Sequence, residues 1–217
     1  SAVFVTHDHA DHIKSVGNIA CDCGKKIYAT QHVHEGISCN RCLKVKVPME
    51  CRAFLEKGCM LEVGSFRITP FDVPHDSRDC VGYVVEADGV RFCLITDVGH
   101  VTDTIREQVG LANYLVLESN HDVNMLQVGP YPYYLKQRIL GNRGHLSNEL
   151  SGKLLSRLLN DHMQTVFLGH LSHENNLAEL AYETVRLEIS IADNEYKPDD
   201  FQICVADRSE ISKIVEI

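Results

Sequence analysis

Short apolar segments alternate along the chain with segments that have helical patterning. The apolar run at residues 2–5 predicts a strand, and similar patterns predict further strands over residues 26–29, 60–63, 65–73, 81–87, 90–96, 114–117, 165–168 and 201–206. Helical spacing of apolar residues predicts helices over residues 13–20, 101–109, 149–159 and 177–191. This order of elements predicts strands sandwiched by helices.

Local signals add detail to this pattern. Asp88-Gly89 is a strong turn signal and predicts that the two strands around it form a hairpin. Ser147 is a good N-cap for the helix that follows it. One stripe of that helix is apolar and is expected to be buried: Leu150, Leu154, Leu155 and Leu158. Residues 31–52 show neither pattern and are expected to be irregular.

The composition is that of an ordinary globular protein, and it predicts one domain over residues 1–217. Of these 217 residues, 44% are hydrophobic and 24% are charged. There is no apolar run of roughly 20 residues and no signal peptide at the start, so we expect a cytoplasmic protein without a membrane partner. The net charge of -9 argues against a generally basic surface for nucleic acid. A phosphate substrate is still compatible, since two divalent metal ions would add about four positive charges at a site. Nothing in the sequence indicates an oligomeric state.

Nine cysteines are an odd number in a chain that is large enough to fold without disulfides. Reduced thiols are therefore expected. A four-thiolate zinc site is an alternative for Cys21, Cys23, Cys39 and Cys42. The spacing of the first pair is unusual for zinc, which favours free cysteines.

A dense cluster of metal-ligand side chains follows the first apolar run. His7 and His9 are two residues apart, so on an extended chain they point to the same side. Asp11 and His12 come where the chain turns towards a helix and can face a second position nearby. Imidazole nitrogen together with carboxylate oxygen suits zinc, manganese or iron. The cluster therefore predicts metal binding.

Four other strands end in polar residues of the same kinds. These residues are His75, Asp97, Glu118 and His170. One such residue at a strand end is commonplace. Four of them in one chain with the histidine cluster predict that one rim of the sheet carries a site.

The motif His7-x-His9-x-Asp11-His12, followed by His75, Asp97 and His170, resembles the ligand motifs of the metallo-β-lactamase fold. The resemblance implies an α+β protein, a four-layer αβ/βα sandwich with a two-metal site at one edge of its two sheets. It implies that His7, His9 and His75 hold the first metal, that Asp11, His12 and His170 hold the second, and that Asp97 bridges them. The family normally begins with strands ahead of this motif. We therefore expect a chain truncated at its N-terminus, which would leave a sheet edge open.

Three later motifs point to one branch of that fold. They are Glu118-Ser-Asn-His-Asp122, Gly144-His145-Leu-Ser-Asn148 and Gly169-His170-Leu-Ser-His-Glu-Asn-Asn176. They resemble motifs of the phosphodiesterase branch, which includes RNase Z, and together they are closest to the YycJ/WalJ group of bacterial cytoplasmic proteins regarded as DNA exonucleases. The resemblance implies that His145 lies close to the scissile phosphate and that Glu118 orients it.

The expected activity is metal-dependent phosphodiester hydrolysis, most simply by a DNA exonuclease that uses a hydroxide activated by two metal ions (Zn, Mn or Fe). Asp11 and Asp97 would orient that hydroxide. His145 would give a proton to the leaving alkoxide, with Glu118 raising its pKa. The alternatives are an RNase Z-like RNA-processing enzyme or small-phosphodiester hydrolase, and a non-catalytic regulatory protein of the same fold. DNA is preferred to RNA by resemblance alone, because no aromatic stacking platform is evident.

Other polar residues have two interpretations each. Ser172 and His173 are candidates to contact substrate, as is Asn175, although helix capping explains this segment equally well. His121 and Asp122 are either partners of metal ligands or loop residues. The basic group Lys136, Arg138 and Arg143 either meets the nucleic-acid backbone or is a solvated helix face. Surface or loop positions are expected for the remaining histidines: His32, His34, His100 and His162.

Overall fold

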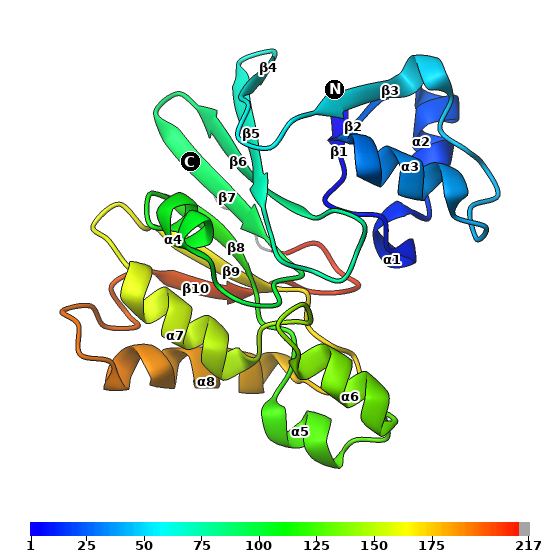
Figure 1. Ribbon diagram of the computed structural model, residues 1–217. Coiled ribbons are helices and arrows are strands. Elements are labelled where there is room, and N and C mark those ends of the chain that lie inside the picture. Colours follow the sequence, from blue (N-terminus) through cyan, green and yellow to red (C-terminus); the bar gives the residue numbers. More distant parts are fainter. Residues whose placement is uncertain (213–217) are drawn as a thin grey trace.

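The computed structural model describes residues 1–212 and contains two β-sheets with helices on their outer faces (Figure 1). One sheet has three strands in the order β1-β2-β3, namely β1 (Ala2–Phe4), β2 (Lys26–Thr30) and β3 (Arg52–Leu55). The other has seven strands in the order β10-β9-β8-β7-β6-β5-β4. Its members are β4 (Leu61–Val63), β5 (Phe66–Asp72), β6 (Val81–Ala87), β7 (Val90–Ile95), β8 (Tyr114–Glu118), β9 (Thr165–Gly169) and β10 (Gln202–Val205). The predicted α+β sandwich is confirmed.

The seven-stranded sheet is mixed. Strands β4 to β7 are antiparallel neighbours, whereas β7 to β10 run parallel to one another. The predicted hairpin joins β6 to β7, and its turn residues Asp88 and Gly89 have φ of 51° and 82°. These left-handed values are those that the two central residues of a tight hairpin turn adopt, which is why the Asp-Gly pair is found there.

Two helices cover the outer face of the three-stranded sheet, α2 (Val16–Cys23) and α3 (Gln31–Cys39). The helix expected over 13–20 is interrupted after α1 (Ala10–Ile13). The prediction of an irregular segment after residue 30 was wrong over α3. Thr30 caps that helix by accepting a hydrogen bond from the Val33 amide, and Val33 and Ile37 are buried one turn apart.

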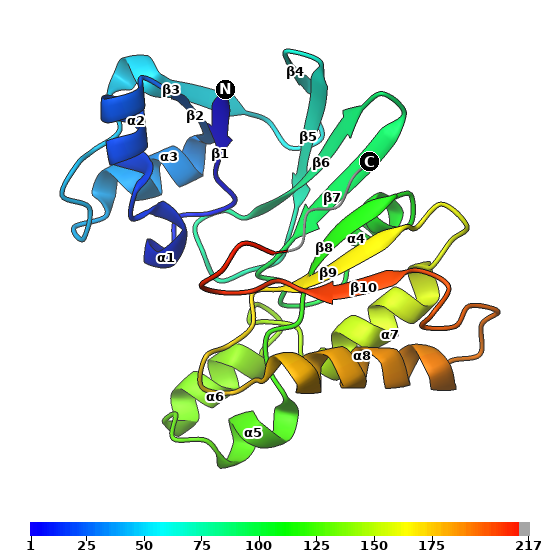
Figure 2. The ribbon, with the colours of Figure 1, turned by 180° about the vertical axis from the view of Figure 1, so that it is seen from behind.

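The outer face of the seven-stranded sheet packs against α4 (Asp103–Val109), α7 (Asn148–Leu158) and α8 (Ala178–Ile191) (Figure 2). Ser147 caps α7 as predicted, because its hydroxyl accepts from the Leu150 amide. Leu154 and Leu155 are buried, but Leu150 is 50% exposed, so its place in the buried stripe was wrong. Leu150 lies in the first turn of α7, outside the buried cluster that Leu154 and Leu155 join.

The inner faces of the two sheets meet in a separate apolar cluster. Leu55, Ile68, Val81 and Tyr83 are its buried members, and Phe4 packs against them. The Tyr83 hydroxyl also donates to the Val5 carbonyl at 2.7 Å, and the Val81 amide donates to the Thr6 carbonyl at 3.0 Å. The segment that carries the first histidines is thereby fixed against the seven-stranded sheet.

Two short helices that the sequence did not predict lie between β8 and α7. They are α5 (Val123–Val128) and α6 (Tyr133–Leu140), and the views in Figures 1 and 2 place them at one end of the seven-stranded sheet. Within residues 1–212, no helix is long and apolar enough to cross a membrane.

Candidate metal centre

The predicted ligands come from five separate segments that meet at one edge of the sandwich. His7 and His9 follow β1, whereas Asp11 and His12 lie on α1. The other three lie directly after strands of the seven-stranded sheet: His75 after β5, Asp97 after β7 and His170 after β9. The structure therefore brings all seven predicted ligands to one place, between the two sheets.

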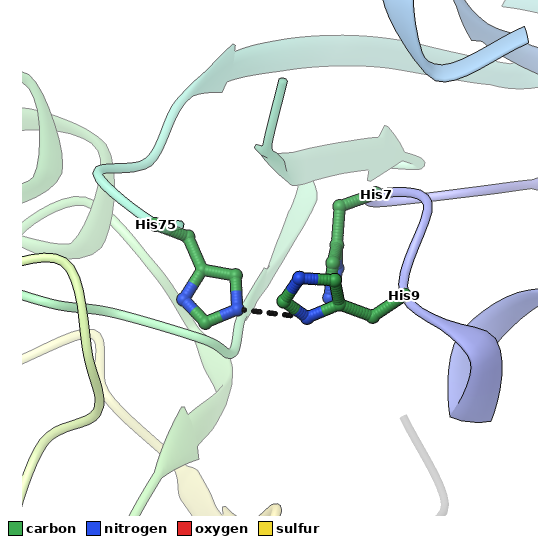
Figure 3. A group of neighbouring side chains, drawn as sticks. All are labelled: His7, His9 and His75. Carbon is green, nitrogen blue, oxygen red and sulfur yellow. Dashed lines mark hydrogen bonds between the residues drawn. The ribbon is translucent and has the colours of Figure 1, made fainter. Parts of the chain in front are cut away.

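Three histidines form the first set. One ligand atom from each of His7, His9 and His75 lies within 4.8 Å of those of the other two. Figure 3 shows their rings converging from the two sides of the site, His7 and His9 from the N-terminal segment and His75 from the opposite loop. The Nε2 atom of His75 lies 3.3 Å from Nδ1 of His9.

The second set is Asp11, His12 and His170, again with ligand atoms within 4.8 Å of one another. Asp97 lies between the two sets. Its Oδ1 is 3.6 Å from Nε2 of His75 and 3.5 Å from Nε2 of His170, while its Oδ2 is 3.5 Å from Nε2 of His12. This carboxylate therefore faces both sets, as the bridging position requires.

The chemical state of this cluster fits a divalent cation. Burial lowers the pKa of His7, His12 and His75, which favours the neutral imidazole, the form whose lone pair can bind a metal. The buried Nε2 of His7 and Oδ2 of Asp97 have no hydrogen-bond partner among the described residues. Buried polar atoms are normally satisfied, and a bound metal ion accounts for both exceptions.

Two of these residues have an unusual backbone conformation. Asp97 and His170 have φ of 60° and 57°, the left-handed region that residues with side chains rarely adopt. Each lies where a buried strand ends. Strained conformations of this kind persist only where the surroundings enforce them, and they concentrate at functional sites.

Glu118 lies beneath the cluster and organises it. Its carboxylate is fully buried and accepts hydrogen bonds from the amides of Asp97, Val98 and Leu146 at 2.9–3.2 Å. The same carboxylate accepts from Nδ1 of both His145 and His170 at 2.8 Å. Burial alone would raise the pKa of Glu118, but the hydrogen bonds from the two histidines hold it well below its usual range.

Glu118 also fixes the orientation and charge of its two histidine partners. Because Nδ1 of each ring bonds the carboxylate, each Nε2 points away from Glu118. Burial by itself would lower the pKa of His145, but the hydrogen bond and charge of Glu118 raise it. The same opposition raises the pKa of His170 to about 9. A ligand histidine held by a buried carboxylate is a common arrangement in metal sites.

A pocket of about 560 Å³ opens over these groups. His145 and Asp97 line it, as do Ser172 and His173, two of the candidates for substrate contact. Asn175 does not: it is fully buried, and its side chain bonds Ser172, so it supports the loop instead of facing a substrate. The expectation of substrate contact by Asn175 was wrong.

Sequence reasoning missed three further polar residues of the pocket: Asp76, Asn120 and Tyr131. Asp76 and Asn120 each lie within two residues of a predicted site residue, and this adjacency was an available signal. Asn120 donates to the His170 carbonyl at 2.8 Å and so helps to hold that ligand. Tyr131 lies in a segment with no element pattern, and nothing in the sequence tied it to the site.

Other predicted residues have structural positions. Asp122 caps α5, and Arg143 donates to the His75 carbonyl at 2.8 Å. His34 was expected at the surface but is buried, because its ring packs under β3 and bonds the Ala53 carbonyl. Among residues 1–212, no group that could hold a metal includes a cysteine, and the thiols of Cys21, Cys23, Cys39 and Cys42 are free and exposed.

Comparison with known proteins gives consistent results. The family model for the beta-lactamase superfamily domain matches residues 1–170. Exodeoxyribonuclease WalJ of Streptococcus pneumoniae is 37% identical over 192 residues, which are 88% of this chain and 71% of that protein. Exodeoxyribonuclease YycJ of Bacillus anthracis is 34% identical over 185 residues, 85% of this chain and 69% of that protein. The crystal structure of the metallo-beta-lactamase fold protein YhfI from Bacillus subtilis has a TM-score of 0.66 at 17% identity, covering 95% of this chain and 74% of that one.

Proposed function

This chain belongs to the beta-lactamase superfamily, within it to the YycJ/WalJ group, and from that membership we propose that it is a DNA exonuclease with a two-metal centre. It is a metal-dependent hydrolase with a His/Asp centre for divalent metal ions. The two relatives that are named exodeoxyribonucleases support nucleic acid as the substrate and favour DNA.

The proposed metal positions follow the two ligand sets. His7, His9 and His75 hold one ion, Asp11, His12 and His170 hold the other, and Asp97 contacts both. Divalent ions in such sites polarise a phosphoryl oxygen and lower the pKa of water. Zinc, manganese and iron are all compatible with nitrogen and oxygen ligands of this kind. Asp11 is exposed, so in this proposal it can also orient the attacking water.

The observation that carries the proposal is the Glu118–His145 pair. Cleavage of a phosphodiester in nucleic acid expels an alkoxide, a poor leaving group that needs a proton. The hydrogen bond to Glu118 at 2.8 Å favours protonated His145 and leaves its Nε2–H directed away from Glu118. Since His145 also lines the pocket, we propose that it protonates the leaving oxygen. A thioester has a better leaving group and less need of such an acid.

A substrate panel tests the proposed activity. Labelled single- and double-stranded DNA, RNA and a bis-aryl phosphodiester are each incubated with the protein in the presence of manganese or of zinc. We expect stepwise shortening of DNA from an end, faster than cleavage of RNA. Faster cleavage of RNA would favour RNA processing as the function. If none of these substrates is cleaved, the proposed phosphodiester hydrolysis at this site is refuted.

Substitution of His145 tests its role as the acid. His145→Ala should lower turnover of DNA by about 100-fold or more, the contribution typical of a general acid. A bis(p-nitrophenyl) phosphodiester should lose much less, because its leaving group needs no proton. The metal content should be unchanged, since His145 is not in either ligand set. His162→Ala, at an exposed histidine away from the pocket, is the matched control. Equal losses on both substrates, or loss of metal, would contradict the role.

Substitution of Asp97 tests the bridging position. Asp97→Asn is the suitable change because asparagine tolerates the left-handed backbone at this position. We expect two metal ions per wild-type chain and fewer in the variant, measured by elemental analysis after dialysis. A variant that retains both ions would argue against the bridge.

A further inference from the structure

One wall of the pocket is formed by α6 and the loop before it. Tyr131, Leu135 and Arg138 line the pocket. Leu135 and Arg138 are three residues apart on α6, which places them on one side of the helix, and Tyr131 lies just before its N-cap. Tyr134 is four residues before Arg138, so it lies next to Arg138 at the edge of the same side. Its side chain is 74% exposed. One tyrosine, Tyr131, thus lines the pocket, and a second, Tyr134, lies one helical turn from Arg138 outside the pocket lining.

The loop that carries Tyr131 is held in place before any ligand binds. Pro130 and Pro132 flank Tyr131 and restrict the backbone on both sides of it. The Lys136 ammonium donates to the carbonyls of Gln127 and Gly129 at 2.7 Å each, which ties α6 to the end of α5. A ring presented by such a loop loses little conformational freedom when a ligand stacks on it.

Arg138 adds a fixed positive charge at the same wall. Its guanidinium forms a two-pronged ion pair with Asp76, with Nη2 3.0 Å from Oδ1. Asp76 in turn lies 3.5 Å from the Nε2 atoms of His9 and His75, so the arginine is anchored beside the first ligand set. Arg138 is 53% exposed and has N–H groups that do not face Asp76. Arginine in this position suits a phosphate.

We propose that Tyr131 and Tyr134 stack on unpaired bases at the end of the strand being cut, while Arg138 contacts the phosphate between them. This inference rests on the proposed nuclease function and names its substrate class as a single-stranded end. Bases offer a free face for stacking only when they are unpaired and separated from their neighbours. With a net charge of -9, the chain has little general attraction for a nucleic-acid backbone beyond the metal centre, so stacking and a local cation would add to the affinity for the strand.

The test compares kcat/KM for a single-stranded oligonucleotide with the values for copies that carry an abasic site near the cleaved end. In the wild-type enzyme, loss of a stacked base should lower kcat/KM by about fivefold to a hundredfold. Tyr131→Ala and Tyr134→Ala should show a similar loss on the intact oligonucleotide and no further loss at the matching abasic site. Tyr131→Phe keeps a ring and should behave as wild type. Tyr133→Ala is the matched control for Tyr134→Ala, because Tyr133 is equally exposed, at 76%, but its position in α6 lies on the side opposite to Leu135 and Arg138.

The outcomes separate this inference from the proposed function. If the wild-type enzyme cuts no nucleic acid, the proposed function fails and the stacking surface fails with it. If the wild-type enzyme cuts but both alanine variants match it on intact and abasic substrates, only the stacking surface is overturned. A flush duplex whose end is locked by a cross-link should be cut more slowly than a single strand, and equal rates would also overturn it. Tyr134 is largely exposed, so its replacement should leave the fold intact, and this variant tests the inference even if Tyr131→Ala is unstable.

Discussion

The buried carboxylate of Glu118 accepts five hydrogen bonds. It accepts from three backbone amides and from two histidine side chains, and it has no contact with solvent. A carboxylate suits this position because both of its oxygens only accept hydrogen bonds. Glutamine would turn one oxygen into an amide group that faces at least two donors.

We therefore predict that Glu118→Gln lowers the free energy of unfolding by about 2 kcal/mol or more, because buried donors lose their acceptor. Urea unfolding of the metal-free proteins measures the effect without interference from metal loss. Glu107→Gln, at an exposed position on α4, is the control and should stay within about 0.5 kcal/mol of wild type. Equal stability of the two variants would contradict the role of Glu118 as the structural centre of the site.

At the scale of elements, the segment between α6 and α7 connects His145 to the rest of the site. The His145 amide donates to the Ile139 carbonyl at 3.0 Å, and the Gly144 carbonyl lies 3.2 Å from Nδ1 of His75. Gly144 passes very close to the end of α6. A Cβ at this position would lie 2.0 Å from the Ile139 carbonyl oxygen, far below any allowed contact.

Gly144→Ala is accordingly expected to push this segment away from α6 and to misplace both His145 and His75. We predict a loss of about tenfold or more in activity, as small misplacements of catalytic groups cause, together with a lower melting temperature. Gly141→Ala in the same segment is the control, since its added Cβ would come no closer than 3.2 Å to its neighbours. Thermal unfolding and DNA cleavage measure the two effects. Similar behaviour of the two variants would show that the close approach at Gly144 is unimportant.

The elements of the fold differ in how well the sequence predicts them. Elements with strong periodicity, such as α8 and the β6–β7 hairpin, were predictable because burial of one face dictates the pattern. The convergence of the candidate ligands was predictable because His75, Asp97 and His170 follow strands and the types of side chain that bind metals are restricted. In contrast, α5 and α6 are short, and α6 buries only Ile139, so no apolar stripe marked it. Tyr131 reaches the pocket through tertiary structure alone.

At the scale of the whole molecule, the proposed metal centre joins two parts of the fold. His7, His9, Asp11 and His12 lie in the segment that follows β1 of the three-stranded sheet, whereas His75, Asp97 and His170 follow strands of the seven-stranded sheet. Besides these ligands, the two sheets are held together by the small apolar cluster around Tyr83 and by contacts such as the bond from Thr30 to Asp79 at 2.7 Å. Metal binding should therefore stabilise the fold as a unit.

Removal of metal with a chelator should lower the melting temperature, and readdition of zinc or manganese should restore it. Binding to the folded state at about 100 times the dissociation constant contributes ~2.7 kcal/mol. For a chain of this size that corresponds to roughly 5–10 °C, which differential scanning calorimetry can resolve. Asp97→Asn removes the carboxylate shared by both ligand sets, so its melting temperature should respond less to metal. A melting temperature that is the same with metal and with chelator would mean that metal binding by these ligands does not stabilise the association of the two sheets.

Because the cluster of Leu55, Ile68, Val81 and Tyr83 contains no metal ligand, it should keep the two sheets associated in the metal-free protein, and thermal unfolding should remain a single transition.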